Sequence, residues 1–150
     1  MFGRKRAPRP AGDAGLQDRA WSMVESGELL VRRNHALATL PDRAAYADFL
    51  LVQVPLRAPG AGDDPLVPGD FARLDALEDA LVAELGEGDE SVLALVITRE
   101  GRRRFVFYTR DRAAAERKAA SVTAQLGEEA DHGGSPDPEW GFYQRFMALR

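Results

Sequence analysis

The chain has 150 residues, 45% of them hydrophobic and 29% charged, which is typical of a single soluble globular domain. It contains no cysteine, which excludes disulfides, cysteine nucleophiles and thiolate metal sites. The net charge is −4, but four basic residues lie within the first ten, so the other 140 residues carry −8 and lack the basic character of a nucleic-acid-binding body.

The first 17 residues are rich in Arg, Pro, Gly and Ala and contain few large apolar side chains that a core could bury. We expect residues 1–17 to form a disordered basic tail and residues 18–150 to form one α+β domain. No apolar run reaches the roughly 20 residues of a membrane span, and no apolar stretch follows the basic terminus as it would in a secretion signal. We therefore expect a cytoplasmic protein with no membrane partner.

The first predicted elements are strands. Trp21–Asn34 predicts a hairpin with its turn at Gly27, because apolar and polar residues alternate on both sides of that glycine. Ala47–Arg57 predicts a further strand, which at Pro55 should be near a sheet edge or about to end, because proline has no N–H to donate. The following segment, Ala58–Gly69, is dense in Gly, Pro and Asp and predicts a loop.

A helix and a central hairpin come next. Phe71–Leu85 predicts a helix because its apolar residues recur at steps of three and four. Ser91–Arg110 predicts two strands that turn at Gly101, and the first strand is apolar on both faces, as in the middle of a sheet. Strict alternation assigns the residues of that strand to two faces: Val92, Ala94 and Val96 to one, and Leu93, Leu95 and Ile97 to the other.

The second long helix is predicted over Arg112–Leu126, with Asp111 as its N-cap and Gly127 at its end. Glu128–Gly133 is short and is compatible with an edge strand.

The final helix is predicted to start with Asp137 as N-cap and Pro138 in the first helical position, where proline costs least. Apolar and aromatic residues cover most of its circumference, so it must pack against a large surface: Trp140, Phe142, Tyr143, Phe146, Met147 and Leu149.

The order of elements from Ala47 onward is the split βαβ pattern. We therefore predict an α+β fold: a ferredoxin-like antiparallel sheet with an N-terminal β-hairpin extension and a C-terminal aromatic helix. Both long helices of such a fold lie on one face of the sheet, and the opposite face here is still apolar, with Phe49 and Leu51 on it. The hairpin, the final helix or a second subunit must cover that face, so a homodimer through the open sheet face is one expected arrangement.

Several motifs occur in the order seen in a bacterial family of uncharacterised proteins. They are a Trp-led hairpin that ends in Arg-Arg-Asn, the helix sequence LDALEDAL, and the closing segment DPEWGFYQRF. On these motifs the chain resembles domain-of-unknown-function family 695 over about Trp21–Phe146. Some relatives carry an additional domain resembling the regulator B of ribonuclease E, which we do not expect in this chain. The resemblance implies no catalytic residue.

Catalytic and metal-binding residues are not indicated. His35 and His132 are the only histidines, and neither has the spacing of a metal site around it. Asp137 and Glu139 lie near His132 in sequence, but a helix cap and a first-turn acid explain them better. The chain also lacks a Gly-x-Ser-x-Gly motif and a phosphate loop. We expect no catalytic residue, metal or cofactor, which argues against an enzyme.

The candidate binding residues fall into two groups. Arg32, Arg33 and Asn34 are candidates for a clamp on an anion or carboxylate, because a guanidinium binds such groups bidentately. Trp140 and Tyr143 lie one helical turn apart and are candidates for a pocket or interface. The structural alternatives are edge-strand charges with a turn-forming Asn for the first group, and the core of the closing helix for the second.

The strand Arg102–Tyr108 occupies the position where ferredoxin-like RNA-recognition domains place stacking aromatic residues. Its candidate nucleic-acid contacts are three consecutive arginines, Arg102, Arg103 and Arg104. In the alternative interpretation, which the acidic body favours, Phe105 and Phe107 belong to the core and the arginines to a solvated hairpin tip.

These observations predict a non-catalytic cytoplasmic binding or regulatory module that acts through contacts with a protein. An RNA-binding module that uses Arg102–Tyr108 is the main alternative, and a small ligand-binding or hydrolytic enzyme is the third.

Overall fold

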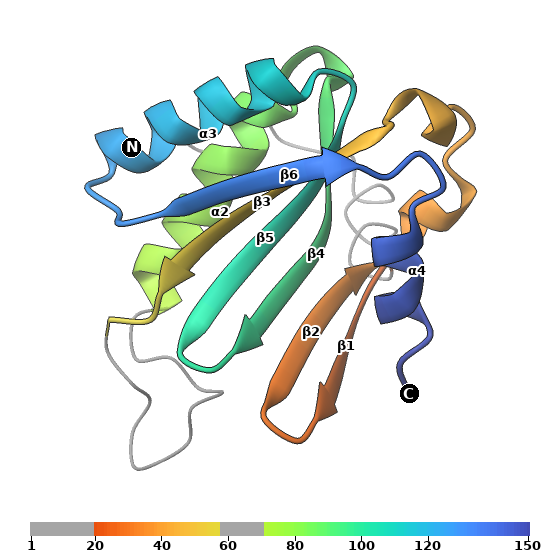
Figure 1. Cartoon of the computed structure of the whole chain (residues 1–150). Coiled ribbons are helices and arrows are strands. Elements are labelled where there is room, and N and C mark those ends of the chain that lie inside the picture. The colour runs from red at the N-terminus through yellow and green to blue at the C-terminus, as the bar shows by residue number, and fades with distance from the viewer. Residues whose placement is uncertain (1–19, 58–70) are drawn as a thin grey trace, which may run out of the picture.

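The computed structural model describes residues 20–57 and 71–150, so the predicted tail over residues 1–17 and the predicted loop over 58–69 lie outside the described residues. The described residues form an α+β fold built on one antiparallel sheet of six strands (Figure 1). None of the helices in these two ranges has the length and hydrophobicity of a membrane span.

The strands are β1 (Trp21–Ser26), β2 (Leu29–Asn34), β3 (Asp48–Pro55), β4 (Ser91–Arg99), β5 (Arg102–Thr109) and β6 (Asp131–Pro136). The helices are α2 (Phe71–Leu85), α3 (Arg112–Gln125) and α4 (Gly141–Met147). Three short 3-10 turns are η1 (His35–Thr39), η2 (Arg43–Ala45) and η3 (Glu87–Asp89).

The order of strands in the sheet is β1-β2-β4-β5-β3-β6, and each strand is antiparallel to its neighbours. The last four strands of this order, together with α2 and α3, form the ferredoxin-like split βαβ arrangement. The hairpin β1–β2 extends the sheet beyond β4. The predicted fold is confirmed, including the N-terminal hairpin extension.

Helices α2 and α3 cover one face of the sheet, behind the strands in Figure 1. The apolar residues of α2 that recur at three- and four-residue steps are buried: Leu74, Leu77, Leu81 and Leu85. Helix α3 starts where the side chain of Asp111 accepts a hydrogen bond from the N–H of Ala114, as predicted. Phe105 and Phe107 of β5 lie in this core, at 0% and 1% exposure.

The opposite face of the sheet is covered by α4 and by the connection between β2 and β3. Its core combines residues of three strands with residues of these covering segments: Val31, Leu37, Tyr46, Ala94, Leu95, Ile97, Val106, Tyr108, Trp140 and Tyr143. Phe49 and Leu51 are half-buried against it. The apolar face is therefore covered by the chain itself, and does not need a second subunit.

Strand β4 contains a bulge that changes which residues share a face. Its register against β5 shifts between Leu93 and Leu95, so Ala94 is an extra residue. Leu93 and Val96 consequently pack under the helices, whereas Ala94, Leu95 and Ile97 face α4. The strict alternation that we predicted is wrong here, because a strand that is apolar on both faces carries no pattern that reveals a bulge.

The last two elements begin later than predicted. Strand β6 spans Asp131–Pro136, at the edge beside β3, rather than Glu128–Gly133. Helix α4 begins at Gly141, because Trp140 has a left-handed backbone with φ 59° that interrupts a helix started at Pro138.

Candidate functional site

Three of the five candidate side chains, those of Arg33, Trp140 and Tyr143, lie where the end of β2 contacts α4, whereas Asn34 contributes its backbone carbonyl there and its side chain donates to the carbonyl of Leu93 at 3.1 Å. Arg33 and Asn34 come from β2, and Trp140 and Tyr143 come from the start of α4. The hydroxyl of Tyr143 donates to the backbone carbonyl of Asn34 at 2.7 Å. Arg32 lies next in sequence but points to the other face of the sheet, because side chains alternate along a strand.

The guanidinium of Arg33 binds the C-terminal end of α4. Its Nη1 donates to the carbonyl oxygens of Phe146, Met147 and Leu149, at 3.3, 3.2 and 2.8 Å. The last carbonyls of a helix have no partner within the helix and carry partial negative charge, so a cation is favourable there. In this structure the clamp that the sequence suggests holds the backbone of the chain itself.

Arg32 does form the bidentate pair that guanidinium chemistry predicts, and its partner is internal. Its two terminal nitrogens donate to Oε1 and Oε2 of Glu78 on α2, at 2.9 and 2.8 Å. The guanidinium also lies over the ring of Trp21, 5.1 Å from its centroid. Arg32 therefore ties the hairpin β1–β2 to helix α2.

Trp140 and Tyr143 pack on the ring of Tyr108 in β5. Trp140 stacks on Tyr108 with ring centroids 3.8 Å apart, and Tyr143 meets Trp140 edge-on at 5.4 Å. The indole N–H of Trp140 donates to the carbonyl of Tyr46 at 2.9 Å. Trp140 and Tyr143 are 0% and 2% exposed, so their rings are part of the core between α4 and the sheet.

Asp137 is the polar centre of this packing. Its carboxylate accepts hydrogen bonds from the hydroxyl of Tyr108 at 2.6 Å, from the N–H of Gly141 at 2.9 Å and from the N–H of Phe142 at 3.0 Å. The Tyr108 hydroxyl in turn accepts from the N–H of Tyr143 at 3.2 Å. Asp137 therefore accepts from the first N–H groups of α4 from four residues before its start, and the prediction that it occupies the N-cap position is wrong, because Trp140 does.

The hydrogen bonds determine the protonation states of this cluster. Burial alone would raise the pKa of Asp137, but the hydrogen bonds from Tyr108, Phe142 and Gly141 outweigh it and hold that pKa below its ordinary value. Burial, with the hydrogen bond to Asp137 second, raises the pKa of Tyr108. Burial also raises the pKa of Tyr143, against the opposing charges of Arg43 and Arg33. At neutral pH Asp137 is a carboxylate and both phenols are protonated.

The pairing of Tyr108 with Asp137 has no signal in the sequence. The two residues come together because β5 and β6 both pair with β3: Asp48 faces Thr109 on one side and Pro136 on the other. Only this strand order places the end of β5 level with the end of β6.

The three candidate nucleic-acid contacts do not share a surface. Arg102 is exposed at the hairpin tip, whereas Arg103 is 5% exposed and its Nε donates to Thr98 Oγ1 at 3.1 Å. Arg104 lies on the opposite face, where its Nε donates to Gln53 Oε1 at 2.6 Å. The aromatic residues of the same strand are buried, so their rings are not open to stacking bases.

Comparison with known protein families identifies the domain. The model of a family described as a family of unknown function, DUF695, matches residues 18–148. The chain belongs to the DUF695 family. The comparisons with curated proteins and with solved structures found no significant match. Both halves of the contact between β2 and α4 lie within the matched residues, so the α4 cover is part of the DUF695 domain.

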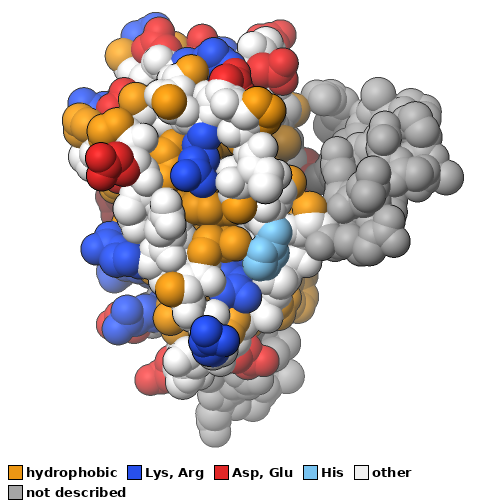
Figure 2. Space-filling model, turned by 90° about the vertical axis from the view of Figure 1, so that its right-hand side faces the viewer, with side chains coloured by type: hydrophobic (Ala, Val, Ile, Leu, Met, Phe, Trp, Pro, Cys, Tyr) orange, Lys and Arg blue, Asp and Glu red, His pale blue; other side chains and the backbone are white. Residues whose placement is uncertain are grey.

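Two shallow hollows lie on the surface formed by the described residues of this DUF695 domain. Figure 2 shows the side on which α4 and the connection η1–η2 lie, where hydrophobic side chains gather at the centre with basic side chains around them. One hollow, of about 420 Å³, lies beside α4. Its lining residues are Phe49, Pro136, Asp137, Gly141, Phe142 and Arg145.

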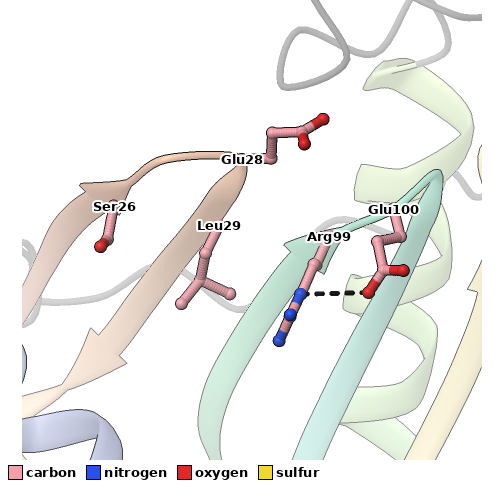
Figure 3. Close-up of a pocket in the computed structure, with 5 residues that line it drawn as sticks. All are labelled: Ser26, Glu28, Leu29, Arg99 and Glu100. Carbon is pink, nitrogen blue, oxygen red and sulfur yellow. Dashed lines mark ion pairs between the residues drawn. The ribbon is translucent and has the colours of Figure 1, made fainter.

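A second hollow, also of about 420 Å³, lies between the tips of hairpins β1–β2 and β4–β5 (Figure 3). Its lining residues are Ser26, Glu28, Leu29, Arg99 and Glu100. Arg99 and Glu100 form an exposed ion pair at 3.1 Å, and the side chain of Leu29 lies across from them on the other hairpin. The described residues contain no group of three His, Cys, Asp or Glu side chains arranged to hold a metal ion.

Replacing Arg33 with lysine is expected to loosen α4 in this DUF695 domain. A lysine keeps the charge but loses the planar guanidinium that reaches the three carbonyls, so we expect a loss of about 1–2 kcal/mol in unfolding free energy and faster amide exchange in α4. Hydrogen exchange measured by mass spectrometry tests this. Arg99→Lys, at an exposed ion pair, is the control and should change stability by less than about 0.5 kcal/mol. Equal exchange in α4 for both variants would refute the capping role of Arg33.

Proposed function

We propose that this DUF695 domain is a non-catalytic binding module, which acts in the cytoplasm through protein contacts and receives an extended segment of its partner along strand β1. The observation that carries the proposal is the open edge of β1. Its six residues pair with β2 in an uninterrupted register, and no strand within the described residues pairs with its outer side. The absence of cysteine suits the reducing cytoplasm.

Strand β1 lacks the features that normally protect a sheet edge. Edge strands offer unpaired N–H and C=O groups, and natural proteins block them with proline, lysine, bulges or short length. The sequence of β1, WSMVES, contains no proline or lysine, and Glu25 is its only charged residue. Met23, near its middle, is 59% exposed. An edge of this kind is suited to strand addition by a partner.

The opposite edge of the same sheet provides an internal comparison. Strand β6 begins at Asp131, contains Gly133 and Gly134, and ends at Pro136, which has no N–H to donate. Each edge strand carries one acid, but glycines weaken a strand and proline discourages further pairing. The edge at β6 therefore has protective residues that the edge at β1 lacks.

The turn geometry indicates which amides of β1 are available. In a hairpin with a two-residue turn, the pair that flanks the turn is hydrogen-bonded, and here that pair is Ser26 with Leu29. Counting back from Ser26, alternate residues direct their N–H and C=O groups toward β2. The intervening residues Trp21, Met23 and Glu25 direct theirs outward.

Selection from a library of displayed random peptides tests this proposal. We expect selected peptides to bind as extended strands, so methylation of alternate backbone amides should weaken binding by about tenfold or more, while methylation of the intervening amides should have little effect. Met23→Lys should weaken binding of the same synthetic peptides. Val82→Lys makes the same change at an exposed apolar residue of α2 and should not. Failure to select any peptide, or equal sensitivity at every amide, would refute strand addition.

The alternative of RNA binding has less support in the geometry. It relies on exposed rings on Arg102–Tyr108, whereas Phe105, Phe107 and Tyr108 are at most 1% exposed. The face that carries Tyr108 is also covered by Trp140 of the α4 segment.

A further inference from the structure

We propose that the partner at this edge is a second copy of the chain, with β1 of one protomer antiparallel to β1 of the other. The inference rests on the proposed function, because it names the occupant of the same edge. It replaces the expected homodimer through the open sheet face, which α4 and Tyr46 already cover.

Two-fold symmetry restricts how β1 can pair with its copy. Residues directly opposite each other in an antiparallel pair point to the same face, so one residue must lie opposite its own copy at the axis. With Met23 at the axis, Trp21 faces Glu25 on the same side of the sheet, and Ser22 faces Val24 on the other. This register uses all three outward-facing residues and forms about six hydrogen bonds between the protomers.

The neighbouring register is less favourable. With Val24 at the axis, only Met23 and Glu25 of the outward-facing residues find partners, and about four hydrogen bonds form. Met23, an exposed apolar side chain, would then lie opposite the carboxylate of Glu25. The Met23 register instead pairs the two methionines with each other, which removes the most exposed large hydrophobic side chain of the described residues from water.

The charge on this edge does not oppose pairing in the Met23 register. Glu25 would face Trp21 of the other protomer, beside the Arg32–Glu78 ion pair, whose guanidinium lies 5.1 Å from the centroid of the Trp21 ring. No two like charges therefore lie opposite each other along the strand. Because a strand pair of five residues buries less than the roughly 1,200 Å² at which standard interfaces begin, we expect a dissociation constant in the micromolar range.

Single cysteines test the register directly, because the chain contains none of its own. In Met23→Cys the two Cα atoms would lie about 5.5 Å apart across the axis, within the range that a disulfide spans. In Glu25→Cys the two positions would lie about 14 Å apart along the strands, too far to bridge. We expect mild oxidation to link Met23→Cys into a dimer at least about tenfold faster than Glu25→Cys or Val24→Cys.

Sedimentation velocity over a concentration series of the full chain provides the second measurement. We expect a reversible dimer, and Met23→Lys should raise its dissociation constant by about tenfold or more, with an unchanged melting temperature at concentrations well below that constant, where both proteins are monomers. Val82→Lys is the matched control and should leave the dissociation constant unchanged.

The possible outcomes distinguish failure of the dimer from failure of strand addition. A monomer at all concentrations, or a dimer that Met23→Lys does not weaken, would overturn the second copy as partner. Faster linkage of Val24→Cys would overturn the register. A monomer that still binds peptides along β1 would refute the dimer and leave strand addition standing, whereas a monomer that binds no peptide would refute both.

Discussion

Replacing Trp140 with alanine should lower the unfolding free energy by about 3–5 kcal/mol, the range for removing a fully buried large aromatic side chain. Trp140 is 0% exposed and stacks on Tyr108 at 3.8 Å, so the truncation removes one of the contacts that join α4 to the sheet. It also leaves the carbonyl of Tyr46 without the indole donor. Urea unfolding followed by circular dichroism measures the change.

Two further variants allow the loss of unfolding free energy in Trp140→Ala to be compared with smaller expected losses. Trp140→Phe keeps a ring on Tyr108 but loses the indole N–H, so we expect an intermediate loss of about 1–2 kcal/mol. Phe71→Ala removes an aromatic side chain that is 50% exposed at the start of α2, and its cost should be much smaller. If Trp140→Ala cost no more than Phe71→Ala, α4 would contribute little to the stability of the fold.

The second large effect is expected from Asp137→Asn. The amide keeps one oxygen but places an NH₂ group where the carboxylate accepts from the N–H groups of Gly141 and Phe142 and from Tyr108. At least one buried donor then loses its acceptor, and we expect a loss of about 1–3 kcal/mol at pH 7. Urea unfolding at a series of pH values from neutral to acidic measures it.

The pH dependence of this effect has a definite sign. Because the pKa of Asp137 in the folded protein lies below its ordinary value of 3.8, the carboxylate stabilises the fold above about pH 4, and this contribution is lost as the pH falls through the folded pKa. The Asn variant has no carboxylate at this position and so cannot lose this contribution. The difference in unfolding free energy between the two proteins should therefore shrink at acidic pH. Glu139→Gln, at an exposed neighbouring acid, should show no such change. A difference that stays constant with pH would contradict the proposed role of the charge.

The types and order of most elements can be predicted from local patterns, because each pattern acts over a few residues. The apolar steps of Phe71–Leu85 coincide with the bounds of α2, and a glycine lies in the turn of each hairpin at a positive φ, 62° for Gly27 and 74° for Gly101. The ferredoxin-like order follows once these elements are arranged with the chirality rules of split βαβ units.

The positions where prediction fails depend on contacts between distant segments. The start of α4 follows from the left-handed backbone of Trp140, whose ring is held on Tyr108, and no local preference of Pro138 and Glu139 could reveal that. The bulge at Ala94 is hidden for the opposite reason, since both faces of β4 are apolar. In each case packing outweighs the local pattern.

The candidate binding residues illustrate the same limit. The sequence identifies Arg32 and Arg33 as groups that bind oxygen ligands, and both do so in the structure. It does not show that the ligands are Glu78 and the end of α4, because only the fold brings those atoms within reach. The position of β1 at the edge of the sheet is likewise a property of the strand order rather than of its own residues.

The contact of Arg33 with α4 has a consequence for how the protein folds. The residues that it joins are more than 110 positions apart in the chain. Strand β2 can pair with β4 only after the ribosome has synthesised β3 and α2, which lie between them in the sequence. Such non-local pairing slows folding, because long loops must close before their contacts form. A nascent chain that has not yet reached residue 137 would expose Tyr108 and Val106, so we expect the unfinished domain to depend on chaperones until the α4 segment emerges.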